Sequence, residues 1–195
     1  AGPLSTNTYL AIDKKTLEAI LIDPGPGSLK QVAAIAKEEG LKVRVIVNTH
    51  GHWDHAAEDE ASKNRFNAEL LIHKADALDV EDPQDVFAGI PKPEPANVDG
   101  YLEDNGILEA GSMRFRIMGT PGHTKGSVCL YSAEKKVLFS GDTLFVGTYG
   151  RTDLDGGDEE EMMESLDMLK KLPPDTLVYP GHGGFGVRLD RCFPD

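Results

Sequence analysis

The placement of histidine is the feature that most constrains how this chain can fold. The sequence holds six histidines, and five of them stand at the end of a strand-like run beside Gly, Asp or Pro. Histidines used only for packing would be scattered over apolar faces. We therefore expect a fold that brings the ends of several strands together, so that imidazoles from distant segments can act at one place.

The densest group is the run H-x-H-x-D-H at 50–55, which follows an apolar, β-branched stretch. Residues two apart on extended backbone point to the same side, so His50 and His52 can reach one cation. Asp54 and His55 lie where the chain should turn into a helix, and there they can serve a second cation. The run predicts a metal site, and surface histidines capped by Asp54 are the alternative.

Three later segments each place one more donor at the end of a strand-like run. His123 and His182 follow Thr-Pro-Gly and Tyr-Pro-Gly, and Asp142 follows Ser-Gly. A three-ligand site with an open position is typical of catalytic metal sites, whereas structural zinc is enclosed by four protein ligands. The donors divide into two sets of three and one further residue. The first set has three nitrogens, from His50, His52 and His123. The second set is mixed, with Asp54, His55 and His182, and Asp142 is free to bridge the two sets.

This donor set favours hydrolysis. Two adjacent divalent ions lower the pKa of a shared water toward about 7, which makes a metal-bound hydroxide available for attack, and they polarise a carbonyl group. The sequence contains no G-x-S-x-G, no G-x-x-x-x-G-K-[ST] and no G-x-G-x-x-G motif. We expect two divalent metal ions, with zinc preferred and iron or manganese as alternatives, because His and Asp ligands accept all three.

Composition limits the partners. The 195 residues suit one domain over 1–195, and the formal net charge of −13 disfavours nucleic acid and anionic membranes as partners. No apolar run approaches the roughly 18 to 20 residues that span a bilayer. Cys129 and Cys192 have no partner at metal-ligand spacing, so we expect free thiols and a reducing, cytoplasmic setting. Composition leaves the oligomeric state open.

Strand-like and helical runs alternate along the chain. Two strand-rich halves, each with helices, predict two sheets packed face to face with helices outside. The stretch 77–104 is Pro-rich and acidic without a sustained period, so we expect a long loop or lid over the site. The expected strands are 8–12, 19–22, 43–47, 69–73, 113–118, 127–131, 137–140 and 176–179, and the expected helices are 28–40, 56–67 and 158–171.

In order and spacing, five segments resemble the metallo-β-lactamase superfamily across nearly the whole chain. The elements G-D-T-L-F and G-R-T-D-L at 141–145 and 150–154 are similar to its glyoxalase II (hydroxyacylglutathione hydrolase) branch, in a short form without the C-terminal helical domain. The resemblance implies an α/β fold, an αβ/βα four-layer sandwich of two mixed β-sheets flanked by helices, with a dinuclear centre at one edge. The segments are Asp23, T-H-G-H-W-D-H at 49–55, T-P-G-H-T at 120–124, S-G-D-T-L-F at 140–145 and Y-P-G-H-G at 179–183.

The resemblance also implies a role for each donor. Asp54 and His55 are expected to act in catalysis as well as in metal binding. Carried over by position, His50, His52 and His123 would bind the first ion, Asp54, His55 and His182 the second, and Asp142 would bridge both.

Four further residues have weaker signals. Asp23 would orient a ligand, since a metal-bound imidazole needs an acceptor for its far N–H, or it would only form a turn before a proline. Arg151 and Asp153 are expected to form an ion pair that braces the loop of Asp142. His73 matches no ligand motif and is interpreted as a histidine at a strand end.

The leading hypothesis for activity is hydrolysis of a small-molecule thioester of the S-lactoylglutathione type. A thiolate with a pKa near 8.5 leaves without a proton donor, which suits a site rich in ligands. The alternatives are a mononuclear iron persulfide dioxygenase, in which His123, His55 or His182 would be unused, a hydrolase of another ester or lactone, and a binding module that kept only the fold. A β-lactamase is disfavoured because Asp142 stands where the common zinc β-lactamases use Cys.

Overall fold

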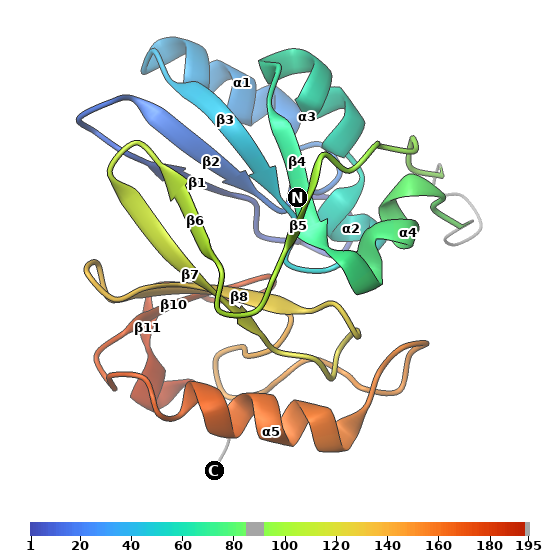
Figure 1. The fold of residues 1–195 in the computed structure, drawn as a ribbon, viewed down its shortest axis with the longest axis vertical. Coiled ribbons are helices and arrows are strands. Elements are labelled where there is room, and N and C mark those ends of the chain that lie inside the picture. The colour runs from blue at the N-terminus through green and yellow to red at the C-terminus, as the bar shows by residue number, and fades with distance from the viewer. Residues whose placement is uncertain (85–91, 194–195) are drawn as a thin grey trace.

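Two β-sheets pack against each other in the computed structural model, which describes residues 1–84 and 92–193 (Figure 1). In the first sheet the strands follow chain order, and only its first pair is antiparallel. Its strands are Tyr9–Ile12 (β1), Glu18–Ile22 (β2), Lys42–Val47 (β3), Glu69–His73 (β4) and Gly100–Leu102 (β5).

The second sheet has the order β11-β10-β9-β8-β7-β6, and only β9 and β10 run parallel. Both sheets are therefore mixed, as predicted. The strands of this sheet are Ile107–Ala110 (β6), Met113–Gly119 (β7), Val128–Ser132 (β8), Val137–Gly141 (β9), Leu177–Pro180 (β10) and Val187–Arg188 (β11).

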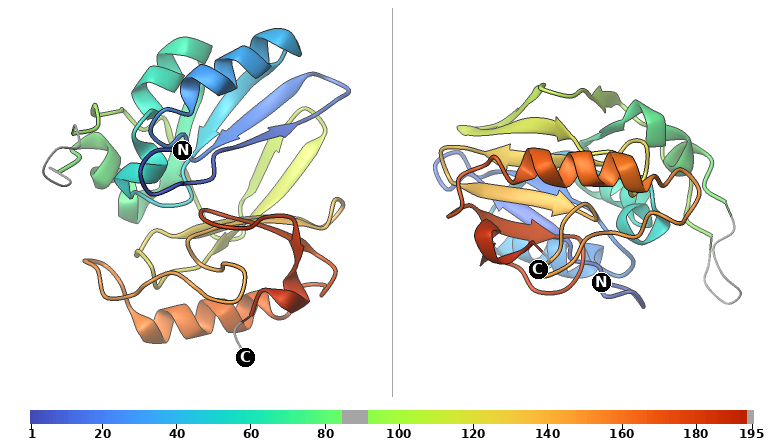
Figure 2. Two further views of the ribbon diagram at one scale, coloured as in Figure 1. Left: turned by 180° about the vertical axis from the view of Figure 1, so that it is seen from behind. Right: turned by 90° about the horizontal axis from the view of Figure 1, so that it is seen from below.

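Helices cover the outer faces of the two sheets, which gives four layers (Figures 1 and 2). Helices α1 (Leu29–Glu38) and α3 (Asp59–Phe66) lie on the first sheet, and α5 (Glu159–Leu169) lies on the second. The Asp158 side chain caps α5 by accepting a hydrogen bond from the Glu161 N–H. The expected αβ/βα sandwich is confirmed. The short helices are α2 (Trp53–Ala56), α4 (Ala77–Glu81) and the 3-10 turns η1 (Lys74–Asp76) and η2 (Leu189–Arg191).

Alternate side chains of β2 pack into two different hydrophobic clusters, which join the layers. Ile20 and Ile22 point into the cluster between the sheets, whereas Ala19 and Leu21 point into the cluster beneath the helices of the first sheet. Residues of a strand alternate between its two faces, so a strand that is apolar at every position is buried on both. A third cluster lies between the second sheet and α5.

The helix predicted over 56–67 is present as α3, but it begins three residues later, and a separate short helix precedes it. Helix α2 begins at Trp53, and α3 begins at Asp59. Between them, the Glu58 carboxylate accepts hydrogen bonds from the Ser28 hydroxyl and the Leu29 N–H at the start of α1. This break places Asp54 in a separate short turn beside the strand ends, and the polar sequence contains no apolar stripe that would have continued one helix.

The long loop predicted over 77–104 is partly wrong. Residues 77–81 form α4, because Ala77 and Val80 pack into the cluster beneath the first sheet. Residues 100–102 form β5, which adds to the sheet by pairing with β4. The part of the predicted lid at 85–91 lies outside the described residues.

No helix in the described part of the chain is long and apolar enough to cross a bilayer. Cys129 and Cys192 are buried free thiols, as expected.

Candidate metal centre

The carboxyl ends of five strands, drawn from both sheets, deliver the candidate residues to one place. Asp23 follows β2, His50 follows β3, His123 follows β7, Asp142 follows β9 and His182 follows β10. Strands β2 and β3 are parallel, as are β9 and β10, so the ends of each pair meet at the same edge of their sheet. The structure brings all seven predicted ligand residues together there.

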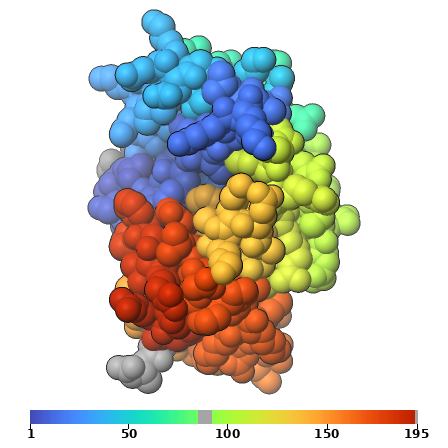
Figure 3. All heavy atoms as spheres, turned by 90° about the vertical axis from the view of Figure 1, so that its left-hand side faces the viewer, coloured from blue at the N-terminus to red at the C-terminus, as the bar shows by residue number. Residues whose placement is uncertain are grey.

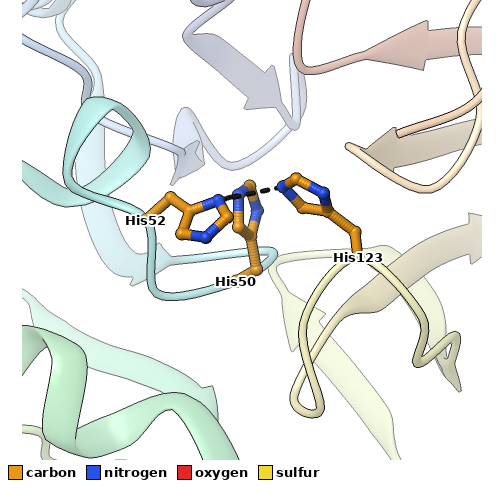
Figure 4. Close-up of side chains that lie close together, drawn as sticks. All are labelled: His50, His52 and His123. Atoms are coloured by element: carbon orange, nitrogen blue, oxygen red, sulfur yellow. Dashed lines mark hydrogen bonds between the residues drawn. The ribbon is translucent and has the colours of Figure 1, made fainter. Parts of the chain in front are cut away.

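The first ligand group consists of His50, His52 and His123, whose imidazoles converge (Figure 4). The His52 Nδ1 lies 3.1 Å from the His50 Nε2 and 2.9 Å from the His123 Nε2. All three donor atoms lie within 4.8 Å of one another. A tetrahedral zinc site is built from nitrogen donors at such mutual spacings, with one position left open.

The second ligand group consists of Asp54, His55 and His182. The His182 Nε2 lies 3.3 Å from the His55 Nε2 and 3.3 Å from the Asp54 Oδ2, and the latter is 3.5 Å from the His55 Nε2. One carboxylate oxygen and two imidazole nitrogens therefore face a common point, as the sequence predicted.

Asp142 spans the two groups. Its Oδ2 lies 3.6 Å from the His123 Nε2 and 3.4 Å from the His182 Nε2, and its Oδ1 lies 3.4 Å from the His55 Nε2. This Oδ1 is buried and, among the described residues, has no hydrogen-bond partner. A buried carboxylate oxygen without a donor is costly unless a cation faces it, so the donor set fits two divalent ions with Asp142 between them.

Burial controls the charge of the first group. It lowers the pKa of His50 well below the ordinary value, helped by the neighbouring imidazoles of His55 and His52. Burial also lowers the pKa of His52 to about 4. Both imidazoles are therefore neutral near pH 7, and a neutral imidazole is the form that binds a metal.

The second group is rich in negative charge. Burial acts to lower the pKa of His55, but the carboxylates of Asp142 and Asp23 raise it to about 9. Burial is likewise outweighed at His182, where hydrogen bonds to Asp142 and Asp54 raise the pKa to about 10. Protons thus balance the carboxylates of this group in the absence of a cation, and bound cations would replace them.

Asp23 orients a ligand. Its Oδ2 lies 3.0 Å from the His55 Nδ1, the nitrogen that faces away from the second group. The same oxygen accepts a hydrogen bond from the Thr49 hydroxyl, which lies 3.1 Å from the His50 Nδ1. Of the two interpretations of Asp23, the structure supports ligand orientation, and this one carboxylate reaches both ligand groups.

A main-chain carbonyl performs the same task for His123. The Arg151 oxygen lies 2.7 Å from the His123 Nδ1. The predicted ion pair between Arg151 and Asp153 is present at 2.7 Å, but both side chains are exposed. A carbonyl oxygen is present at every residue, so nothing in the sequence marks this contact. His73 stays outside the centre, and its side chain accepts a hydrogen bond from the Ala75 N–H.

The N-terminal segment completes the second group, which the sequence analysis missed. The Leu4 carbonyl lies 3.0 Å from the His182 Nδ1, and the Thr6 hydroxyl donates to the Asp54 Oδ2 at 2.7 Å. In Figure 3 this segment, in dark blue, adjoins the C-terminal part of the chain, in red. The residues of the first contact are 178 positions apart, so no local pattern could have revealed it.

A cavity of about 740 Å³ opens beside both groups. Its wall combines ligand residues with the apolar side chains of Leu4, Trp53, Phe145 and Leu154. Among the described residues, none from the predicted lid at 77–104 lines this cavity, and Arg151 is the one Lys or Arg that does. The site therefore offers a small molecule a wall that combines possible metal ligands with apolar side chains.

Comparisons with known proteins agree with this geometry. The family model described as "Metallo-beta-lactamase superfamily" matches residues 1–182. Hydroxyacylglutathione hydrolase GloC of Haemophilus influenzae is 33% identical over 178 residues, which cover 86% of this chain and 81% of the relative.

Two solved structures are similar over nearly their whole length. BLEG-1 B3 metallo-beta-lactamase has a TM-score of 0.89 and 34% identity, with 97% of this chain and 92% of that chain covered. TTHA1623 in a di-iron-bound form has a TM-score of 0.84 and 35% identity, with 97% and 93% covered.

Proposed function

This chain belongs to the metallo-β-lactamase superfamily, and from that premise we propose that it hydrolyses a small-molecule thioester of the S-lactoylglutathione type. The observation that carries the proposal is a seven-donor centre that opens into a cavity whose described lining contains no Ser, Thr, Cys or Lys. The Asp and His side chains of that lining all belong to the seven donors, so water is the attacking group in this proposal. The similarity to GloC supports a thioester as the substrate.

Divalent cations, when bound by the two groups, supply a water that ionises near neutral pH and an electrophile for the carbonyl oxygen. The chain itself supplies orientation. Burial opposes ionisation of Asp54, but hydrogen bonding to His182 and the proximity of His55 lower its pKa, so it stays a carboxylate. With Oδ2 fixed by the Thr6 hydroxyl, Asp54 would accept a hydrogen bond from an attacking water and orient it toward the substrate.

The leaving group needs little help in a thioester. A thiolate with a pKa near 8.5 departs without a proton, whereas an amide nitrogen must be protonated as it leaves. The apolar wall of Leu4, Trp53, Phe145 and Leu154 would hold the substrate against the centre, and Arg151 can match one carboxylate of its thiol half.

β-Lactam hydrolysis is a second candidate, because BLEG-1 is 34% identical to this chain over 97% of its length. Asp142 stands where the common zinc β-lactamases use Cys. This difference does not exclude β-lactam hydrolysis by a protein similar to BLEG-1. Turnover of a chromogenic cephalosporin under the conditions used for thioesters separates the two reactions.

Metal content separates a dinuclear hydrolase from the mononuclear iron dioxygenase. The seven donors converge, which supports two ions, and TTHA1623 is a relative in a di-iron-bound form. Two ions per chain and no oxygen uptake with persulfides are expected. One iron per chain with oxygen uptake would favour the dioxygenase. We propose zinc first, with iron and manganese as alternatives.

The direct test is release of free thiol, followed with a thiol-reactive dye, from S-lactoylglutathione and from an uncharged N-acetylcysteamine thioester. Activity is expected to disappear on chelation, to return with added metal, and to be lost in His52→Ala. His73→Ala is the matched control, since His73 stands at a strand end outside the centre, and it should retain activity. No thiol release from any acyl thioester by the metal-loaded protein would contradict the proposal.

A further inference from the structure

We propose that Asp76 is a positioning residue for the first ligand group. Asp76 belongs to none of the ligand motifs, closes the 3-10 turn η1 after β4, and is 2% exposed. A carboxylate buried to this extent is costly unless donors surround it. Its hydrogen-bond partners therefore show what the residue does.

Those partners lie on the two loops that carry the first group. The Asp76 Oδ2 accepts hydrogen bonds from the Gly51 N–H at 3.0 Å and from the Thr124 hydroxyl at 2.6 Å. The Oδ1 accepts from the Gly126 N–H at 2.7 Å. Gly51 stands between His50 and His52, and Thr124 follows His123 directly. One buried carboxylate thus joins loops that follow β3 and β7, strands of different sheets.

Close packing keeps this connection rigid. A Cβ atom built on Gly126 would lie 2.5 Å from the Asp76 carboxylate, and one built on Gly51 would lie 2.8 Å from the Asp79 Cβ and 2.9 Å from the Asp76 carbonyl oxygen. Glycine at both positions lets the two loops approach the carboxylate closely enough for the hydrogen bonds to form. The geometry leaves little room for either loop to shift while Asp76 is in place.

The hydrogen bonds are charge-assisted and shielded from water, which makes them strong. An Asn at position 76 keeps the shape but turns one acceptor into a donor, which then faces an N–H or a hydroxyl. At least one loop must then move. Partners that orient metal ligands typically change metal affinity by about 10- to 100-fold when they are removed. Since each contact of Asp76 described above lies on a loop of the first group, the loss should be confined to that group.

The inference rests on the proposed dinuclear centre, but it does not depend on which substrate is hydrolysed. The experiment is titration of metal-free protein with Co²⁺ alone, followed by the visible absorption of the bound ion. The parent protein should bind two Co²⁺ ions. In Asp76→Asn, one site is expected to weaken at least about tenfold, with the other unchanged within about twofold.

Asp79→Asn is the matched control. Asp79 lies three residues further on and, together with Asp76, lines a small cavity beside His52. Its side chain packs against Gly51 but makes no hydrogen bond to either loop among the described residues. The control makes the same change of charge in the same neighbourhood. It should leave both Co²⁺ sites as they are in the parent.

Two backgrounds identify the affected site. His182→Ala removes a donor of the second group, so the remaining high-affinity site is the first, and adding Asp76→Asn should weaken it at least about tenfold. His123→Ala removes a donor of the first group, and there Asp76→Asn should have no effect on the remaining site. Should Asp76→Asn fail to fold, Thr124→Val removes a single hydrogen bond to the carboxylate and should weaken the same site about threefold or more.

Equal weakening in both backgrounds, or an Asp76→Asn titration that matches Asp79→Asn, overturns the inference and leaves the metal centre standing. A parent protein that binds fewer than two Co²⁺ ions overturns the dinuclear centre and this inference together.

Discussion

The two ligand groups of the centre are built in different ways. The first has three imidazoles from two loops; His50 and His123 are 1% and 3% exposed, and His52 is partly exposed. The second combines Asp54 with two imidazoles, and its His182 side chain is 26% exposed. The first group is held by nearby main-chain and buried side-chain contacts, whereas the second depends on the N-terminal segment through Leu4.

This difference predicts which ligand group loses its metal ion more readily. A mostly buried set of imidazole nitrogens keeps its geometry without a cation, because packing fixes the side chains. The second group places the Asp54 carboxylate beside that of Asp142, whose charges protons or cations must balance, and its partly exposed His182 is held by the N-terminal segment and is freer to move. We therefore expect the first group to bind its ion independently and the second to lose its ion first.

The largest effect is expected from Asp142→Ala, which removes the carboxylate that lies against donor atoms of both groups. Thioester hydrolysis should fall by at least about 1,000-fold, since several kcal/mol of transition-state stabilisation depend on the paired ions. Metal content should drop at both groups. Asp153→Ala, an exposed carboxylate close in sequence, is the control, and it should retain both ions. Retention of two ions by Asp142→Ala would mean that the groups do not share this ligand.

Asp23→Asn should affect the second group more than the first. Asp23 lies 3.0 Å from the His55 Nδ1 but reaches His50 only through the Thr49 hydroxyl. Metal affinity at the second group is expected to fall by about 10- to 100-fold, as measured by competition with a chromogenic chelator.

Asp13→Asn is the control for Asp23→Asn. Asp13 is also a buried carboxylate that accepts main-chain hydrogen bonds, from Lys15 and Ser112, but it lies outside the centre. It should leave metal affinity unchanged. An equal loss at both ligand groups in Asp23→Asn would remove the distinction between them.

Much of the fold, and the seven residues that converge at the strand ends, could be predicted from the sequence. Two facing sheets with helices outside follow from alternating strand-like and helical runs, and a Pro-Gly or H-x-H signature marks the strand ends around His50, His123 and His182. These signals are local: a few neighbouring residues determine that a strand stops and which side chain it presents. The stretch 77–104 lacks such local signals, so α4 and β5 could not be predicted from it.

The partners that orient the donors could not be predicted. Leu4 and Arg151 act through main-chain carbonyls, which are the same in every residue. Asp76 is an ordinary acidic residue in the sequence, and it meets Gly126 because β4 and β7 end at the same place in the fold. Such contacts depend on the packing of the two sheets, which the pattern of single residues does not record.

A smaller effect is expected from Thr6→Val, which removes the hydroxyl that donates to the Asp54 Oδ2 at 2.7 Å. A hydrogen bond to a charged group contributes about 1.5 kcal/mol, so affinity at the second group should fall by about tenfold or less. The first group should not respond. Thr16→Val, an exposed threonine distant from the centre, is the control. Loss of affinity at the first group instead would show that the N-terminal segment supports the whole centre.

The smallest effect is expected from Arg151→Ala, because the contact that orients His123 is made by the Arg151 carbonyl and not by its guanidinium. The side chain pairs with Asp153 on the surface, where an ion pair stabilises little. Metal affinity at the first group should change by less than about twofold. The Michaelis constant for a thioester with an anionic thiol half should rise, since Arg151 lines the cavity, and that for an uncharged thioester should not. A clear loss of metal in Arg151→Ala would show that the surface ion pair, and not the main chain alone, holds the loop that orients His123.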